Sequence, residues 1–341
     1  MKTAVLLLNI GTPAAPTRSA VRRYLHRFLM DARVVALPIW ARVLLVYGFI
    51  VPFRAKRSLR AYQAIWQPEG SPLSVLSQAL VDALGNQLGP LYCVKMGMRY
   101  GPVTIETVLA EWWAVHPPER LIIIPLFPQY AESTQGSSVA CVMQWLAQQK
   151  VIPATHVLGD FFSDPDFIQV QAAHIAAHTP VQSIERWLIS YHGLPHRALT
   201  VLGCDVVACE RQGGCPPITE TNRFCYRAQC EASTALLQQA LAWTVPSKTV
   251  FQSRLGRLAW LSPLTEHQLV EWARQGIKNL GIVCPSFVTD CLETLEEIQI
   301  RGQALWKAHG GVCLHVVPAL NATPAWVTYL AERVRRLSEK I

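Results

Sequence analysis

Charge is scarce in this sequence, and several common binding motifs are missing. Charged residues make up 16% of the 341 residues and hydrophobic ones 51%, a composition that excludes intrinsic disorder. The glycines near Gly11 lack Gly-x-Gly-x-x-Gly spacing, which argues against a dinucleotide site. No Lys/Arg run interleaved with aromatics and no zinc-finger spacing occurs, so we expect no nucleic-acid partner.

We also expect no cleavable export signal. The apolar run after Met1 is short and ends at Asn9, before Gly-Thr-Pro. We therefore expect a cytoplasmic protein whose ten cysteines stay reduced. The net charge of +8 favours either an anionic membrane surface or small-molecule carboxylates as partners.

No uninterrupted apolar run is long enough for a convincing transmembrane span. The nearest candidate, residues 34–53, is interrupted by Pro38 and Arg42. A charge near the middle of a lone span is costly. An apolar lip that lies on the membrane surface, with Trp40 and Tyr47 at the interface, fits this pattern better. A buried helical hairpin of a soluble domain is the alternative.

Short apolar runs alternate with amphipathic ones along the chain, which is typical of parallel sheets covered by helices. The pattern occurs twice. We expect two Rossmann-like α/β domains: residues 1–158 with the lip, residues 159–309, and a last strand and helix at 310–341 that pack across the junction. A helix is expected at Leu292–Ala304. The expected strands are Ala4–Asn9, Leu91–Met96, Arg120–Pro125, Thr155–Leu158, Trp187–Tyr191, Thr249–Gln252, Leu280–Cys284 and Val312–Val317.

Polar motifs follow the ends of several expected strands. Asn9-Ile10-Gly-Thr follows the first, Pro128-Gln-Tyr130 the third, Tyr191-His192-Gly the fifth and Pro285-Ser-Phe287 the seventh. Ligands of such sheets bind beyond the carboxyl ends of the strands. This shared placement predicts one active-site cleft between the two domains.

Two residue types in these motifs suit proton and metal transfer. Asp290, Glu293 and Glu297 have helical spacing that places them on one face, where they can receive protons or pass on a hard cation. Acids in a first helical turn also simply suit the helix dipole. His192 is a candidate base because imidazole titrates near neutral pH, although a single His is more often structural.

Collinear motifs over roughly 300 residues make the chain similar to the ferrochelatase family. They are Leu6 to Pro13, Gly70 to Leu73, Met98 to Gly101, Pro125 to Tyr130 with Thr134 to Ser137, Ser190 to Pro195, Phe251 to Arg254, Trp260-Leu261, and Pro285 to Thr294. The resemblance implies a chelatase-like fold and the insertion of Fe²⁺ into a porphyrin. It also implies that residues 34–53 frame the porphyrin mouth and attach the enzyme peripherally to the inner face of the cell membrane.

The resemblance assigns catalytic roles to His192 and Glu293, on opposite faces of the porphyrin. It leaves open whether His192 accepts protons or binds iron. Asp290, Glu293 and Glu297 would form an acidic conduit for iron. Candidate porphyrin-binding residues are Ile10, Met98, Arg99, Tyr130, Ser137, Trp260 and Phe287. The alternative for Trp260, Phe287, Tyr130 and Met98 is a place in the core, which is favoured for Met98, and the alternative for Arg99 is a solvated side chain.

Five cysteines lie within 27 residues, in a segment (about 204–225) that resembles an insertion relative to plainer ferrochelatases. They are Cys204, Cys209, Cys215, Cys225 and Cys230. No Cys-x-x-Cys pair is present, which counts against an ordinary zinc knuckle. Four thiolates suit a [2Fe–2S] cluster, which some family members carry. We favour the first four as ligands, because Cys230 aligns with a position that is often Cys without a cluster. Structural zinc and free thiols remain alternatives.

The resemblance favours protoporphyrin IX as the substrate. Relatives that metallate coproporphyrin III usually have Ala-Tyr-Gly-Thr where this chain has Asn9 to Thr12, and they lack a prominent apolar lip. A cobalt-inserting relative and a non-catalytic haem or iron carrier are further alternatives. The oligomeric state is not indicated by the sequence.

Overall fold

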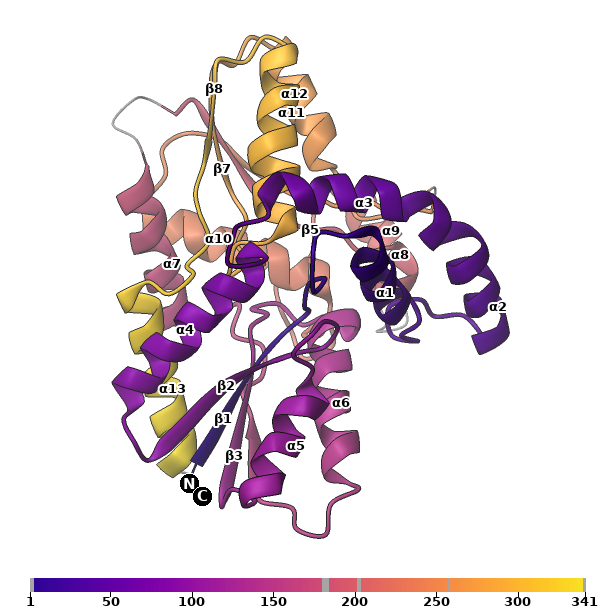
Figure 1. Cartoon of the computed structure of the whole chain (residues 1–341). Coiled ribbons are helices and arrows are strands. Elements are labelled where there is room, and N and C mark those ends of the chain that lie inside the picture. The colour runs from indigo at the N-terminus through magenta and orange to yellow at the C-terminus, as the bar shows by residue number, and fades with distance from the viewer. Residues whose placement is uncertain (1–2, 180–183, 201–203, 257, 340–341) are drawn as a thin grey trace. The chain divides into compact units, whose positions relative to one another are not determined.

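Two compact units make up the computed structural model, which describes residues 3–179, 184–200, 204–256 and 258–339. The first unit contains residues 1–127, 131–159 and 321–341, and the second contains residues 128–130 and 160–320. Each unit is built on its own four-stranded parallel sheet (Figure 1). Because parallel strands need crossover connections, helices alternate with strands in both units.

The sheet of the first unit has the order β2-β1-β3-β4. Every residue of the central strand β1 is buried, as expected of an apolar strand covered on both faces. Helices α5 and α6 pack on one face, where Leu6 and Leu8 meet Leu109 and Val142. The strands are β1 (Thr3–Asn9), β2 (Tyr92–Met98), β3 (Arg120–Pro125) and β4 (Ala154–Val157). The helices are α1 (Arg18–Leu29), α2 (Ile39–Val43), the π-helix η1 (Leu44–Ile50), α3 (Val51–Ile65), α4 (Pro72–Leu88), α5 (Ile105–Val115), the π-helix η2 (Glu132–Gly136), α6 (Ser137–Leu146) and α13 (Pro324–Glu339).

The sheet of the second unit has the order β6-β5-β7-β8. One face is covered by α11 and α12, where Trp272 and Trp306 pack against Leu188 and Ile282. The strands are β5 (Arg186–His192), β6 (Ser247–Gln252), β7 (Asn279–Val283) and β8 (Cys313–Val316). The helices are α7 (Pro165–His178), α8 (His196–Thr200), α9 (Val206–Arg211), α10 (Tyr226–Leu241), α11 (Thr265–Arg274), the π-helix η3 (Glu293–Gly302) and α12 (Gln303–Ala308).

The predicted fold class is confirmed, and each expected strand is present with ends that differ by two residues or fewer. Helices α3, α4, α8 and α9 were not expected. The helix expected at Leu292–Ala304 is a π-helix over most of that length and becomes α-helical only at Gln303. Single π turns often lie at functional sites, because the wider turn redirects side chains.

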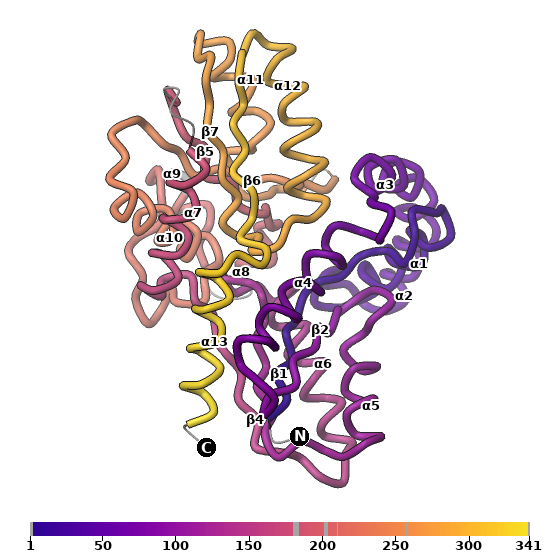
Figure 2. The backbone as a smooth tube through the Cα atoms, turned by 60° about the vertical axis from the view of Figure 1, so that its left-hand side comes forward, coloured from indigo at the N-terminus to yellow at the C-terminus, as the bar shows by residue number. Residues whose placement is uncertain are grey.

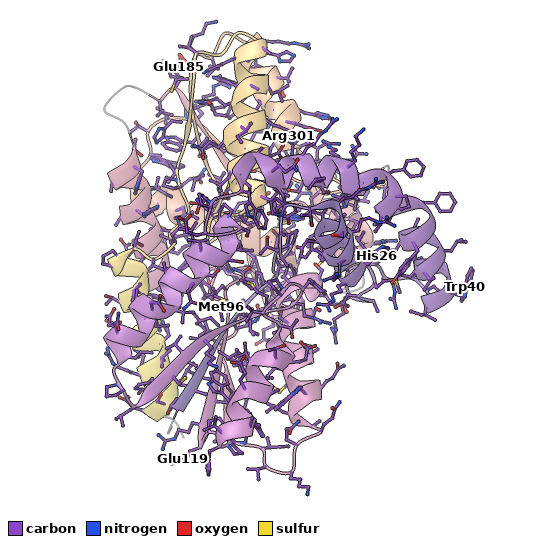
Figure 3. All side chains as sticks on the ribbon, viewed as in Figure 1. His26, Trp40, Met96, Glu119, Glu185 and Arg301 are labelled. Atoms are coloured by element: carbon purple, nitrogen blue, oxygen red, sulfur yellow. The ribbon has the colours of Figure 1, made fainter. Side chains whose placement is uncertain are left out.

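Residues 34–53, the segment expected to form an apolar lip, include α2 and η1 and expose several large apolar side chains. Trp40 is 71% exposed and Phe53 is 80% exposed, so a buried hairpin is excluded. Arg42, which interrupts the apolar run, is buried and donates from Nη1 to the Val35 carbonyl at 3.3 Å. Figure 2 shows α1, α2 and α3 gathered together, and Figure 3 shows Trp40 projecting from α2. Within the described ranges, no helix has the length and apolarity that a membrane crossing requires.

Candidate active site

His192 is the last residue of β5, in the second unit. Its Nδ1 lies 2.6 Å from the Gly193 carbonyl oxygen. A carbonyl only accepts hydrogen bonds, so in the neutral ring Nδ1 carries the proton and Nε2 presents a lone pair. The Tyr226 hydroxyl fixes the backbone here by donating to the His192 carbonyl at 2.9 Å. His192 therefore has the tautomer that a proton acceptor or metal ligand needs at Nε2.

Aromatic side chains adjoin this strand end. The Phe287 ring centroid is 6.3 Å from that of His192. The backbones of Pro195 and Trp260 form an antiparallel bridge, which brings Trp260 to the turn after His192. A Cβ at Gly193 would stand 2.8 Å from the Gln252 carbonyl oxygen and 3.4 Å from the Trp260 ring. Only glycine at position 193 lets the Gln252 carbonyl and the Trp260 ring come this close to the turn. The predicted porphyrin-binding residues Phe287 and Trp260 both lie close to His192.

Glu293 is connected to His192 through Gln252. In the β5–β6 register Gln252 is the partner of His192, and its Nε2 donates to the Glu293 carbonyl at 2.9 Å. Gln252 is buried and also accepts from the Ser190 hydroxyl at 2.7 Å. One amide thus joins the strand that carries His192 to the first residue of η3. Gln252 lies within the Phe251 to Arg254 motif, and no local sequence signal indicates its bridging role.

Glu297 has two hydrogen-bond donors from a single residue. The Ser253 backbone N–H donates to Oε1 at 2.8 Å, and the Ser253 hydroxyl donates to Oε2 at 2.5 Å. Burial raises the pKa of Glu297, and the hydrogen bonds from Ser253 oppose that shift. The nearby Glu293 carboxylate raises the pKa further, so the net pKa is above the ordinary glutamate value. The two glutamates therefore interact electrically along η3.

Asp290, the third predicted acid, has structural partners. Its side chain is buried, accepts from the Thr294 hydroxyl at 2.8 Å and accepts from the Ala319 N–H at 3.2 Å. These contacts tie the start of η3 to the loop after β8.

Tyr130, which belongs to the second unit, is held by α10. Its N–H donates to the Gln229 side chain at 2.6 Å, and its ring packs edge-on against Phe224 at a centroid distance of 5.6 Å. The remaining predicted porphyrin-binding residues lie in the first unit. Met98 is 4% exposed and belongs to the core, and Ile10 follows β1 with its N–H bonded to the Asn9 side chain.

Arg99 and Ser137 lie together in a network that includes Asp31. Arg99 donates from Nε to the Ser137 hydroxyl at 2.8 Å and from Nη2 to Asp31 at 2.9 Å. The Ser137 and Tyr100 hydroxyls donate to the same Asp31 oxygen at 2.6 and 2.7 Å. Burial opposes ionisation of Asp31, but these hydrogen bonds and Arg99 outweigh it, so its pKa is lowered. No local sequence signal marks Asp31, which lies 68 residues from Arg99.

Four cysteines of the Cys-rich segment interact with one another. The Cys215 and Cys204 thiols are hydrogen-bonded to the Cys225 sulfur, which lowers the pKa of Cys225 to about 5 despite its burial. Cys209 interacts electrostatically with Cys204 and Cys215. Cys230 is fully buried, and its thiol contacts Tyr226. In the part of the chain that the structure describes, no three His, Cys, Asp or Glu side chains form a ready ligand shell for a metal ion.

Comparison with known proteins places these features in a family. The sequence profile of the family described as Ferrochelatase matches residues 2–337. A protein named Ferrochelatase from Coxiella burnetii (strain CbuG_Q212) is 43% identical over 336 residues, which cover 98% of this chain and 94% of that protein. Ferrochelatase from Legionella pneumophila (strain Paris) is 42% identical over 328 residues, 96% of this chain and 97% of that protein. The solved structure of SirB from Bacillus subtilis with Fe³⁺ shares the fold, with a TM-score of 0.50 and 14% identity over 98% of this chain and 95% of that one. The chain belongs to the ferrochelatase family.

Proposed function

We propose that the enzyme inserts Fe²⁺ into protoporphyrin IX, which yields protohaem and two protons. Membership of the ferrochelatase family makes the protein an enzyme that inserts iron into a porphyrin. The observation that carries the assignment of roles is the Gln252 bridge between the strand end at His192 and the first residue of η3. It joins a base and an acidic helix within one rigid core.

His192 serves as the proton acceptor for the pyrrole N–H groups. Its Nδ1 is occupied by the Gly193 carbonyl, so protons are received at Nε2.

Glu293 and Glu297 receive Fe²⁺ and replace part of its water shell. Carboxylates bind a divalent cation of this kind, and weak partial coordination allows its release into the porphyrin. A bound cation would also favour the ionised form of Glu297, which burial and Glu293 disfavour in the free enzyme. Asp290 contributes by fixing the start of η3, through Thr294 and Ala319.

Trp260, Phe287 and Tyr130 provide apolar walls for the macrocycle. Arg99 and Ser137 would bind a propionate. Because Asp31 already neutralises part of the Arg99 charge, we expect this contact to be mainly a hydrogen bond.

The Cys-rich segment fits a [2Fe–2S] cluster held by Cys204, Cys209, Cys215 and Cys225. Support comes from the hydrogen bonds of Cys204 and Cys215 to Cys225, from the electrostatic interaction of Cys209 with Cys204 and Cys215, and from the low pKa of Cys225, because the thiolate is the form that binds metal. Such a cluster would supply a redox-active cross-link between the segment and the start of α10. The full burial of Cys230 against Tyr226 disfavours it as a ligand.

The apolar lip supports peripheral attachment to the cytoplasmic face of the cell membrane. Exposed Ile39, Trp40, Leu44, Phe49 and Phe53 would enter the interface, while the buried Arg42 keeps its charge within the protein. A substrate as apolar as protoporphyrin would then reach the enzyme without crossing water.

Anaerobic incubation with Fe²⁺ and either protoporphyrin IX or coproporphyrin III tests the function. We expect turnover of protoporphyrin, abolished in His192→Ala while porphyrin binding is kept, and unchanged in the control His178→Ala on α7. Preference for coproporphyrin would establish the alternative substrate. Porphyrin binding without turnover by the unaltered protein would establish a carrier, and full activity of His192→Ala would remove this residue from the mechanism.

A further inference from the structure

Helix α1 presents a strongly basic face beside the lip. Its sequence contains four arginines and no acidic residue, and Arg18, Arg22, Arg23 and Arg27 are all exposed. Arg18 and Arg22 are four residues apart, as are Arg23 and Arg27, so like charges are neighbours on the helix surface. Such pairs destabilise a helix. An anionic partner would turn this unfavourable arrangement into a favourable one.

The charges line a shallow, open surface groove. Arg22, Arg23, His26 and Arg27 form it together with Tyr47 of η1. The His26 ring is stacked on the Tyr47 ring at a centroid distance of 4.0 Å. Burial and the neighbouring Arg22 lower the pKa of His26, so its ring is a neutral wall of the groove at pH 7. Tyr47 is 53% exposed and is also part of the lip, so the groove and the apolar surface are continuous.

The protein supplies little to neutralise this groove. Arg27 donates to a neutral carbonyl, that of Gly101, at 3.3 Å. Among residues 3–179, 184–200, 204–256 and 258–339, no carboxylate forms an ion pair with Arg22, Arg23 or Arg27. By contrast, Arg33 and Arg99 of the same unit pair with Glu132 and Asp31.

We infer that this groove binds the phosphate of an anionic phospholipid in the bilayer on which the lip rests, an inference that depends on the proposed membrane attachment. Basic residues near an anionic leaflet each contribute about fivefold in affinity. The lip supplies the apolar contribution and α1 the electrostatic one, which are the two signals that stable peripheral binding requires. Exposed aromatic and aliphatic side chains beside the groove favour a lipid over a nucleic acid as the source of phosphate.

Vesicle flotation of the full chain, without porphyrin or iron, tests the inference. One set of vesicles contains phosphatidylcholine alone, and the other also contains phosphatidylglycerol. The variant Arg22→Gln/Arg23→Gln is compared with Lys150→Gln/Arg274→Gln, which removes two exposed charges elsewhere. We expect the α1 variant to lose roughly 25-fold in partitioning onto anionic vesicles and nothing on neutral ones. The control should change less than twofold, and Arg22→Lys/Arg23→Lys should keep the preference.

The remaining outcomes separate the inference from its premise. The variant Trp40→Ser/Phe53→Ser should lose binding to both kinds of vesicle. Equal binding of the unaltered protein to both kinds would overturn the groove, whereas binding to neither would overturn membrane attachment itself. Two competitors test the lipid assignment: millimolar inorganic phosphate at constant ionic strength, and duplex DNA. If either one displaces the protein from anionic vesicles, the lipid assignment is overturned.

Discussion

Ser253 holds both carboxylate oxygens of Glu297, one through its N–H at 2.8 Å and the other through its hydroxyl at 2.5 Å. Ser253 has φ of +66°, in the left-handed region that non-glycine residues rarely occupy. Strained backbone of this kind persists where the surroundings enforce it, and it is frequent at functional sites. The strain here aims two donors at one half-buried acid of η3.

Replacing Glu297 by Gln tests its electrostatic environment through pH. Folding raises the pKa of the Glu297 carboxyl above its ordinary value of 4.5. At a pH between these two values, the folded state therefore binds more protons than the unfolded state. Stability contributed by this group therefore falls as pH rises through that window. Glutamine does not titrate, so Glu297→Gln should gain stability relative to the unaltered protein as pH rises from 4 to 8. Urea unfolding across that range measures the difference; a difference independent of pH would contradict the assigned shift.

Gln252 should be a positioning residue whose loss affects both stability and turnover. Gln252→Met leaves the Ser190 hydroxyl and the Glu293 carbonyl without this partner, at a cost of about 2–4 kcal/mol. Because η3 is then less well fixed relative to His192, we expect kcat to fall with little change in the KM for porphyrin. Gln238→Met, which removes one hydrogen bond to Ser247 at the far end of β6, is the control. Unchanged kcat in Gln252→Met would limit Gln252 to a structural role.

Periodicity predicted the two sheets, and the strand-end motifs placed His192 and Phe287 after the fifth and seventh strands. They succeeded because apolar runs and turn residues are local properties of the chain. Glu297 was expected on one α-helical face with Asp290, but the π-helix and the contacts of Asp290 with Thr294 and Ala319 depend on tertiary packing. Asp31 could not be predicted for the same reason, since its partners are far away in the sequence.

Asp31→Asn should destabilise the first unit at neutral pH. The carboxylate pairs with Arg99 and accepts from the Ser137 and Tyr100 hydroxyls, and removing one partner of a largely buried pair costs about 3 kcal/mol. Its pKa is lowered on folding, so this stability is present above the ordinary value of 3.8 and is lost as pH falls through the lowered pKa. The gap between variant and unaltered protein should thus close in acid.

The matched control for this measurement is Asp82→Asn. Asp82 is exposed and accepts only from Gln78 on the same helix, so its replacement should change stability by less than about 0.5 kcal/mol. A gap for Asp31→Asn that persists unchanged below pH 3 would show that lost packing, rather than lost charge, explains the effect.

The cysteine segment predicts a coloured protein. Purified anaerobically, it should contain iron and acid-labile sulfide in equal amounts and absorb visible light. Cys225→Ser should abolish the absorption, because Cys225 contacts both Cys204 and Cys215 and no nearby thiol can replace it without moving the start of α10. Cys230→Ser should keep the colour, since Cys230 packs against Tyr226. A colourless protein with stoichiometric zinc would show that the segment holds a structural zinc ion instead of a cluster. If Cys230→Ser loses the colour and Cys209→Ser keeps it, Cys230 is a ligand in place of Cys209.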